Sequence, residues 1–103
     1  MAPMALIMRV AHGLYLRWDR LSSAERRRTA PFAEDVKQGA LDLRGRTDHR
    51  AAEAELLAAS ERLAAELAES AERDPELDSA DVARLRAELA RELERLANRD
   101  RAA

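Results

Sequence analysis

Alanine and leucine recur at helical intervals along the second half of the chain, and this spacing constrains the fold more than any other feature. In two segments, 48–73 and 79–99, successive apolar residues lie three or four positions apart, so each set occupies one face of an α-helix. Both sets contain an interval of eleven residues, which favours nearly straight helices over a left-handed supercoil. The members are Ala52, Leu56, Ala59, Leu63, Leu67 and Ala71 in the first set and Val82, Leu85, Leu89, Leu93 and Leu96 in the second.

The connection between these two segments is a short turn. It reads DPELDS, in which Pro75 ends one helix and Asp78 or Ser79 caps the next. Thr47 or Asp48 is expected to cap the start of the first segment. Because the connection is only about five residues long, we expect the two helices to fold back as a long antiparallel C-terminal hairpin.

The first half of the chain predicts three shorter helical pieces. An N-terminal helix over 5–21 carries its apolar residues on one face, and Gly13 within it would permit close approach of another backbone. A short helical turn over 23–29 follows. Pro31 is expected to stop this turn and to begin a middle helix over 31–44, because proline disfavours the helical conformation of the residue before it.

Two local signals mark the ends of these pieces. The residues from Ser22 to Glu25 form a capping-box pattern, in which the serine hydroxyl and the glutamate carboxylate satisfy backbone amides at a helix start. Gly45 is expected to supply a left-handed residue at the end of the middle helix. The sequence therefore predicts an all-α helical bundle forming a single domain over 1–103.

Composition agrees with a helical fold and excludes some chemistry. Only three glycines and three prolines occur, and 47% of residues are hydrophobic. There is no cysteine, which excludes disulfides, thiolate catalysis and cysteine-based zinc sites, and suits a reducing cytoplasm. Cations are arginine except for Lys37, a bias typical of GC-rich bacterial genomes. Met8 is a plausible native start, so 1–7 is expected to fray; this apolar stretch is too short to cross a bilayer.

Charge is divided unevenly along the chain. Residues 1–47 contain nine basic and five acidic residues, whereas 48–103 contain nine basic and fifteen acidic ones. Two oppositely charged halves can attract each other within one chain or between two. A single hairpin would bury only one narrow seam and leave the flanks of the leucine stripes partly exposed to water. We therefore expect a homodimer whose hairpins share a core. The expected interface residues are Leu56, Leu63, Leu67, Leu85, Leu89, Leu93 and Leu96.

The aromatic and basic residues of the first half are candidates for binding a partner. Tyr15 and Trp18 lie one helical turn apart, and an arginine triplet, Arg26, Arg27 and Arg28, follows. Trp18 is more often a packing residue with its indole N–H at the edge of a core. The triplet suggests an alternative role in nucleic-acid binding, but the chain's pI of about 5.7 argues against it, and a solvated or bridging role is favoured.

Catalytic and metal-binding patterns are missing from the sequence. Each of the two histidines lacks the supporting ligands that a metal site or a general base requires; His49 has Glu53 four residues later, which is a very weak signal. Pairs such as Arg84 and Glu88 are expected to decorate the surface. We therefore expect no enzyme, no cofactor and no metal. Lipid binding by the first helix is a third class, less favoured than packing.

These observations together predict a small, non-catalytic, cytoplasmic interaction or scaffold protein. It would be homodimeric and would bind an unidentified protein partner through the region from Tyr15 to Arg28. Nucleic acid and membrane are not the expected partners.

Overall fold

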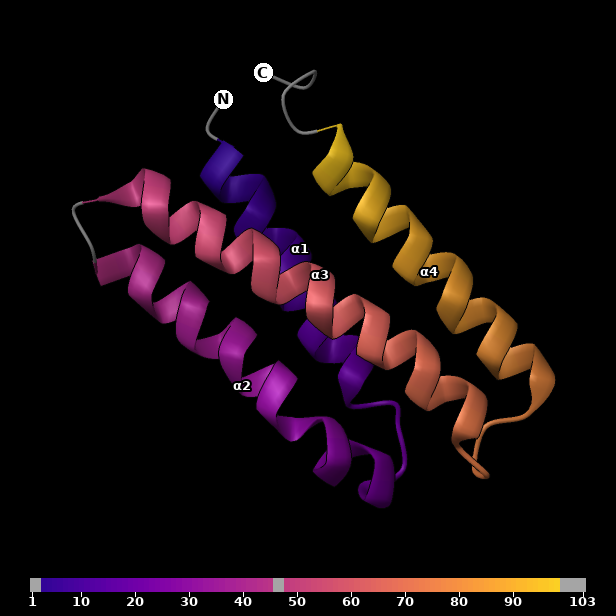
Figure 1. Ribbon diagram of the computed structural model, residues 1–103. Helices are drawn as coiled ribbons and strands as arrows, with labels where there is room; N and C mark the ends of the chain where they lie inside the picture. The colour runs from indigo at the N-terminus through magenta and orange to yellow at the C-terminus, as the bar shows by residue number, and fades with distance from the viewer. Residues whose placement is uncertain (1–2, 46–47, 99–103) are drawn as a thin grey trace.

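The computed structural model describes residues 3–45 and 48–98, and within these ranges the chain is all helical, with four helices and no strand. This confirms the all-α bundle (Figure 1). The helices are α1 (Pro3–Trp18), α2 (Ser23–Gly45), α3 (His49–Arg73) and α4 (Ser79–Ala97).

Two of the four helices form the centre of the bundle. α1 and α3 pack on each other, and each also contacts both α2 and α4. α2 and α4 lie on opposite flanks of α3, with α1 behind it (Figure 1). α4 runs back along α3 from the turn that joins them. The result is a flat molecule with extents of 43 × 27 × 15 Å, in which the flanking helices do not touch each other within the described residues.

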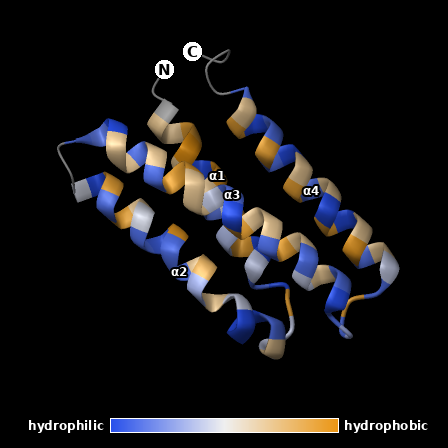
Figure 2. Ribbon diagram, in the orientation of Figure 1, coloured by the Kyte–Doolittle hydropathy of each residue, from blue (hydrophilic) through white to orange (hydrophobic). Residues whose placement is uncertain are grey.

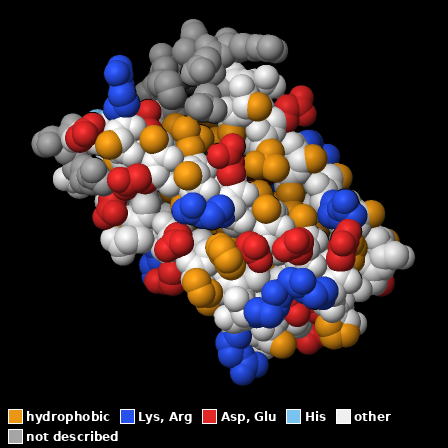
Figure 3. Space-filling view, viewed as in Figure 1, with side chains coloured by type: hydrophobic (Ala, Val, Ile, Leu, Met, Phe, Trp, Pro, Cys, Tyr) orange, Lys and Arg blue, Asp and Glu red, His pale blue; other side chains and the backbone are white. Residues whose placement is uncertain are grey.

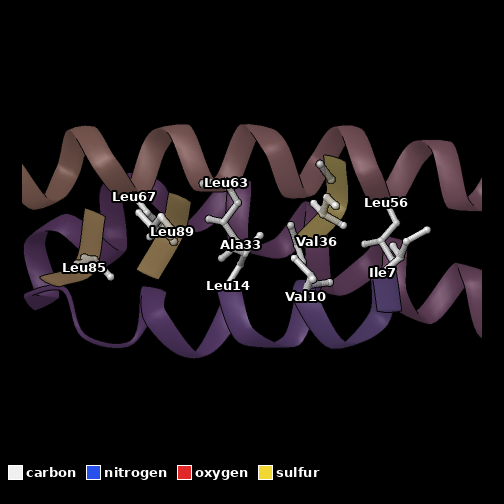
Figure 4. Packing of buried hydrophobic residues seen from close by; sticks show 14 of the residues in the cluster. Ile7, Val10, Leu14, Ala33, Val36, Leu56, Leu63, Leu67, Leu85 and Leu89 are labelled. Carbon is white, nitrogen blue, oxygen red and sulfur yellow. The ribbon is translucent and has the colours of Figure 1, made fainter. Parts of the chain in front are cut away.

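The core lies where the apolar stripes of the central helices face each other. Leu56, Leu63 and Leu67 of α3 point toward α1, where they meet Leu14 and Ile7 (Figure 4). Ala33 and Val36 of α2 and Leu85 and Leu89 of α4 close this core from the two sides. All four helices carry hydrophilic residues as well as this apolar stripe (Figure 2).

Most of the predicted dimer interface lies inside the single chain, so that prediction is wrong for six of its seven residues. Leu93 is 37% exposed and is the only one of the seven that a second copy could reach. The sequence pattern defined a buried stripe correctly, but α1 covers the hairpin more fully than its length suggested, because it lies between α2 and α4. The six buried leucines are Leu56, Leu63, Leu67, Leu85, Leu89 and Leu96.

Local capping signals identified three helix starts, with one correction. Asp48 accepts a hydrogen bond from the backbone of Ala51, and Asp78 forms a reciprocal capping box with Asp81. The Ser22 hydroxyl accepts a hydrogen bond from the Glu25 amide at 3.4 Å. The predicted return contact from the Glu25 carboxylate is wrong, because Asp74 takes the backbone N–H of Ser22 at 2.8 Å instead. Thr47, the other predicted cap for α3, lies outside the described residues.

Proline does not interrupt α2, so the predicted division into 23–29 and 31–44 is wrong. α2 is continuous from Ser23 to Gly45 with Pro31 inside it. An internal proline removes one backbone hydrogen bond and costs about 3 kcal/mol. Contacts of the preceding turn oppose that cost: Thr29 is fully buried, and its hydroxyl donates to the Glu25 carbonyl at 2.7 Å while accepting the Trp18 indole N–H.

The helix ends differ from the predicted ones in three places. α1 ends at Trp18 rather than at residue 21. At its start, α1 includes 3–7, and Ile7 is buried in the core, so the expected fraying is wrong for that part. Gly45 is the last residue of α2 and has no left-handed conformation. α4 ends at Ala97, and residue 99 lies outside the described part.

An ionic seam joins α1 to α4. Arg17 Nε donates to Glu88 at 2.9 Å, and its Nη1 donates to Glu92 at 2.8 Å. Both glutamates are buried, so the expectation that Arg84 and Glu88 form a surface pair is wrong. A Cβ on Gly13 would lie 2.5 Å from Glu92 Oε2, so this glycine accommodates a carboxylate of α4 rather than another backbone.

Candidate functional site

An open groove runs between α1 and α2 and has a volume of about 720 Å³. On α1 its lining residues are spaced three and four apart, so they form a second stripe beside the buried one. On α2 they span just over two helical turns. We call it the α1–α2 groove; it is lined by Met8, Arg9, Ala11, His12 and Tyr15 of α1 and by Val36, Lys37, Ala40, Leu41 and Arg44 of α2.

The groove has an apolar floor and taller walls. Ala11 and Val36 form the floor and are almost fully buried. Short side chains at Ala11 and Ala40 leave the space between the helices unfilled. Leu41 stands on the wall with 51% of its surface exposed, which makes it one of the most exposed large apolar side chains of the described chain.

Positive charge surrounds this apolar floor. Arg9, Lys37 and Arg44 are exposed lining residues, and His12 lies among them on α1. None of the described lining residues is acidic, and α1 contains no Asp or Glu. An apolar floor inside a cationic rim is complementary to a ligand that is apolar on one side and anionic at its edges.

A second, smaller groove lies between α3 and α4. Its volume is about 490 Å³, and hydrophobic side chains gather in it on the face shown in Figure 3. Leu93 is its most exposed large apolar residue, and its rim carries one acid and one base, Glu61 and Arg86. We call it the α3–α4 groove; its alanines are Ala64, Ala65, Ala68, Ala90 and Ala97.

The two aromatic residues predicted to bind a partner have different places in the structure. Tyr15 lines the α1–α2 groove. Trp18 packs against Tyr15, with ring centroids 5.4 Å apart, and donates its indole N–H to the buried hydroxyl of Thr29 at 2.9 Å. The indole therefore anchors α1 to α2, which agrees with the packing role that the sequence favoured for Trp18.

The arginine triplet does not form one free patch. Arg26 donates to the Asp19 carbonyl at 2.9 Å and to the Ser23 hydroxyl. Arg28 pairs with Glu25 and donates to the Ser70 hydroxyl of α3 at 2.7 Å. Arg27 is exposed, and no described residue pairs with its side chain. The three guanidinium groups thus serve two intramolecular connections and one solvated position.

Several carboxylates in the bundle are held in their charged form by these connections. Hydrogen bonds from Arg28 and Ser70 hold the pKa of Glu25 below its ordinary value. Burial raises the pKa of Asp74, but the backbone amides of Ser22 and Glu76 outweigh burial and leave the pKa lowered. Such shifts can mark functional sites, but here the hydrogen bonds that lower the pKa values lie within α2, between helices or within a turn, which indicates a structural role.

The same holds for the ionic seam. Arg20 lowers the pKa of Glu88 most, against the opposing effect of burial, and Arg17 lowers it further. Both arginines are engaged within the chain. Arg20 pairs with Glu88 at 3.0 Å, and Arg17 also donates to Glu92 and to the Gly13 carbonyl. The seam fixes α4 against α1 and separates the two grooves.

Most of the groove was not apparent from the sequence. Tyr15 was the only predicted binding residue that the structure places there. Lys37 and Leu41 carried no motif, although the absence of acids from α1 and the position of Leu41 beside the main apolar stripe were available signals. In the described part of the chain, no group of three or more His, Asp or Glu side chains could hold a metal ion, and no helix is long and apolar enough to cross a membrane.

Comparisons with known proteins do not assign a family: no family model, curated protein or solved structure matches the chain.

Proposed function

We propose that this chain is a non-catalytic interaction module of the cytoplasm, which binds a protein partner in the α1–α2 groove and pairs with a second copy through the α3–α4 groove. One observation carries the first part: an apolar groove with an exposed leucine, Leu41, remains open between two helices that are otherwise well packed. Open apolar grooves of this kind commonly receive a helix of another protein.

The groove has the dimensions of such a contact. Met8 and Tyr15 are two helical turns apart on α1, which corresponds to about 10 Å at 1.5 Å per residue. Val36 and Arg44 are about 12 Å apart on α2 by the same measure. Two to three turns of a partner helix would therefore span the groove, with two or three apolar side chains inserted between its walls.

The chemistry of the lining residues favours binding over catalysis. Among the lining residues that the structure describes, His12 is the only imidazole, and no carboxylate is available to orient it as a general base. Tyr15 is the only hydroxyl in this described set. Arginine, lysine and aliphatic side chains suit recognition of shape and charge, and they provide no paired nucleophile and base.

Self-association through the α3–α4 groove has a separate basis. A twofold interface places the same surface on both partners, so that surface must be complementary to itself. The α3–α4 groove meets this condition, because it has Leu93 to insert, alanines to receive it, and both signs of charge at its rim, where Glu61 is exposed and Arg86 pairs with Glu72 of the same chain. The α1–α2 groove does not, because its rim would bring cations against cations.

The nucleic-acid alternative has less support. It depended on Arg26, Arg27 and Arg28 acting together, and two of these side chains are engaged within the chain. DNA or RNA would be bound mainly through its phosphates, so this role would not explain the apolar floor between α1 and α2.

A matched pair of leucine variants tests the proposed function. Leu41 and Leu16 are exposed to 51% and 53%, but only Leu41 lines the α1–α2 groove. Leu41→Asp and Leu16→Asp should both fold with wild-type helicity, because neither side chain is in the core. In a lysate of the source organism, we expect proteins retained by the wild type and by Leu16→Asp to be lost with Leu41→Asp. Equal retention by the two variants would remove the groove as the binding surface.

A further inference from the structure

The charges around the α1–α2 groove define the kind of partner more narrowly than its apolar floor does. We propose that the occupant is an acidic amphipathic helix of another protein, with a narrow apolar face flanked by carboxylates. This inference rests on the proposed function and specifies the partner of the same groove.

Charge complementarity carries the first step. Arg9 lies on one wall of the groove, and Lys37 and Arg44 lie on the other, so a bound helix would have cations along both of its edges. The structure gives none of these three side chains an acidic partner among the described residues. They are therefore free to pair with carboxylates of a ligand, unlike Arg17 and Arg28, which are engaged within the bundle.

The depth of the apolar residues carries the second step. Ala11 and Val36 are almost fully buried at the floor, so only a side chain that projects into the groove can contact them. A helix presents such side chains at intervals of three, four and seven residues, which matches a groove about two turns long. A bilayer surface is flat on this scale and would contact the rim without reaching the floor.

The partner is a different protein because the chain does not offer a matching segment of its own. The large apolar residues of the acid-rich half, on α3 and α4, are buried or half-buried in the bundle, and only Leu93, at the α3–α4 groove, is an exposed one among the described residues. That groove is lined by both Glu61 and Arg86, so its charge is mixed rather than acidic.

The test uses the full chain and a pair of helical peptides of about 18 residues. Both peptides carry leucine at positions i, i+3, i+4 and i+7; one has glutamate at the flanking positions and the other has lysine there. Fluorescence anisotropy of the labelled peptides reports binding. We expect the glutamate peptide to bind with micromolar affinity and the lysine peptide at least about tenfold more weakly.

Two pairs of variants locate the contact. Leu41→Asp should weaken the glutamate peptide at least about tenfold, whereas Leu16→Asp should leave its affinity within about twofold. Lys37→Glu should weaken the glutamate peptide and strengthen the lysine peptide. Arg27→Glu makes the same charge change on α2 outside the groove, and should shift neither affinity by more than about twofold. Circular dichroism of each variant establishes that the helices are retained.

Each other outcome has a distinct meaning. If both peptides bind equally and Leu41→Asp weakens both, the acidic partner is wrong and the groove remains a helix-binding site. If neither peptide binds, or if Leu41→Asp and Leu16→Asp act alike, both the partner and the proposed function are wrong. Co-sedimentation with phosphatidylserine vesicles that Leu41→Asp abolishes, without peptide binding, would assign the groove to a lipid surface and overturn the inference.

Discussion

The α1–α2 groove and the α3–α4 groove are two open seams of one bundle, and they differ mainly in charge. The first has Leu41 on its wall and only cations on its rim. The second has Leu93 on its wall and both signs of charge on its rim. A surface with one sign of charge repels its own copy and attracts an oppositely charged partner, whereas a surface with both signs can pair with itself. This difference in charge would keep the proposed self-association and the proposed partner binding on separate surfaces.

The ionic seam between α1 and α4 makes this separation possible. Arg17 joins Glu88 and Glu92 of α4 to α1, so α4 is held by buried ion pairs in addition to its buried leucines. Around α2 the core includes Val36 and Leu43 of that helix. Because the two flanking helices do not touch, a change at one groove should leave the other unchanged, and the predictions below test this independence.

The largest effect is expected from filling the α1–α2 groove without altering its charge. Ala40→Phe should weaken the glutamate peptide about thirtyfold, because the new ring occupies the space of an inserted side chain. Ala65→Phe makes the same change at the α3–α4 groove and should leave peptide affinity within about twofold. Anisotropy titrations measure both. Equal weakening by the two substitutions would show that the grooves are coupled.

A somewhat smaller effect is expected on self-association. Leu93→Asp should raise the dimer dissociation constant about tenfold, because it removes an apolar contact and places a carboxylate at the α3–α4 groove. Sedimentation equilibrium measures the constant, and Leu16→Asp is the control with a comparable exposed leucine. A wild-type chain that stays monomeric at high micromolar concentration would contradict the proposed dimer.

The ionic seam should make the attachment of α4 sensitive to acid. Arg20 and Arg17 hold the pKa of Glu88 below its ordinary value, so the charged form favours the folded state. Its contribution is present above the ordinary pKa and is lost as the pH falls through the lowered one. Glu88→Gln should therefore cost about 1 kcal/mol at pH 7 and almost nothing near pH 3.

Urea unfolding at the two pH values measures this difference. Glu94→Gln, an exposed position on the same helix, should show no comparable loss at either pH. A cost of Glu88→Gln that is the same at pH 7 and near pH 3 would contradict the assigned role of the seam.

Salt is expected to have the smallest effect and to separate the grooves by their charge. Raising ionic strength from about 50 to about 500 mM should weaken the glutamate peptide about threefold, because exposed cations around the α1–α2 groove are screened. The dimer dissociation constant should change less, because the α3–α4 groove, through which the dimer is proposed to form, is lined mainly by alanine and leucine. A dimer that weakens more than the peptide complex would reverse this comparison.

Much of the fold could be predicted from the sequence because local patterns report helical faces directly. The spacing of Leu56, Leu63 and Leu67 identified the core stripe of α3, and Asp48 and Asp78 identified two helix starts. These features depend on residues within a few positions of one another, and a sequence displays them fully.

Features that depend on tertiary contacts were mispredicted. Pro31 is a strong local stop signal, but the buried hydrogen bonds of Thr29 keep the helix continuous around it. Glu88 and Glu92 have the composition of a surface helix, and their burial is favourable because Arg17 and Arg20, which lie outside that helix, pair with them. No local pattern contains that information.

The candidate site shows the same limit. Tyr15 was predicted to bind a partner because of its type, and it lines the groove. Lys37 and Leu41 were not predicted, because the groove exists only through the distance between α1 and α2 and through the small size of Ala40. Spacing along a helix indicates which residues share a face, but it does not indicate how far apart two faces lie.

The most direct test is an NMR titration of the whole chain with the glutamate peptide, in which backbone and side-chain chemical shifts are monitored. We predict that the perturbed residues will cluster at His12, Tyr15, Lys37 and Leu41, while Ala65 and Leu93 keep their shifts. Perturbations confined to the α3–α4 groove, or an absence of perturbation at saturating peptide, would contradict the assignment of the α1–α2 groove as the partner-binding surface.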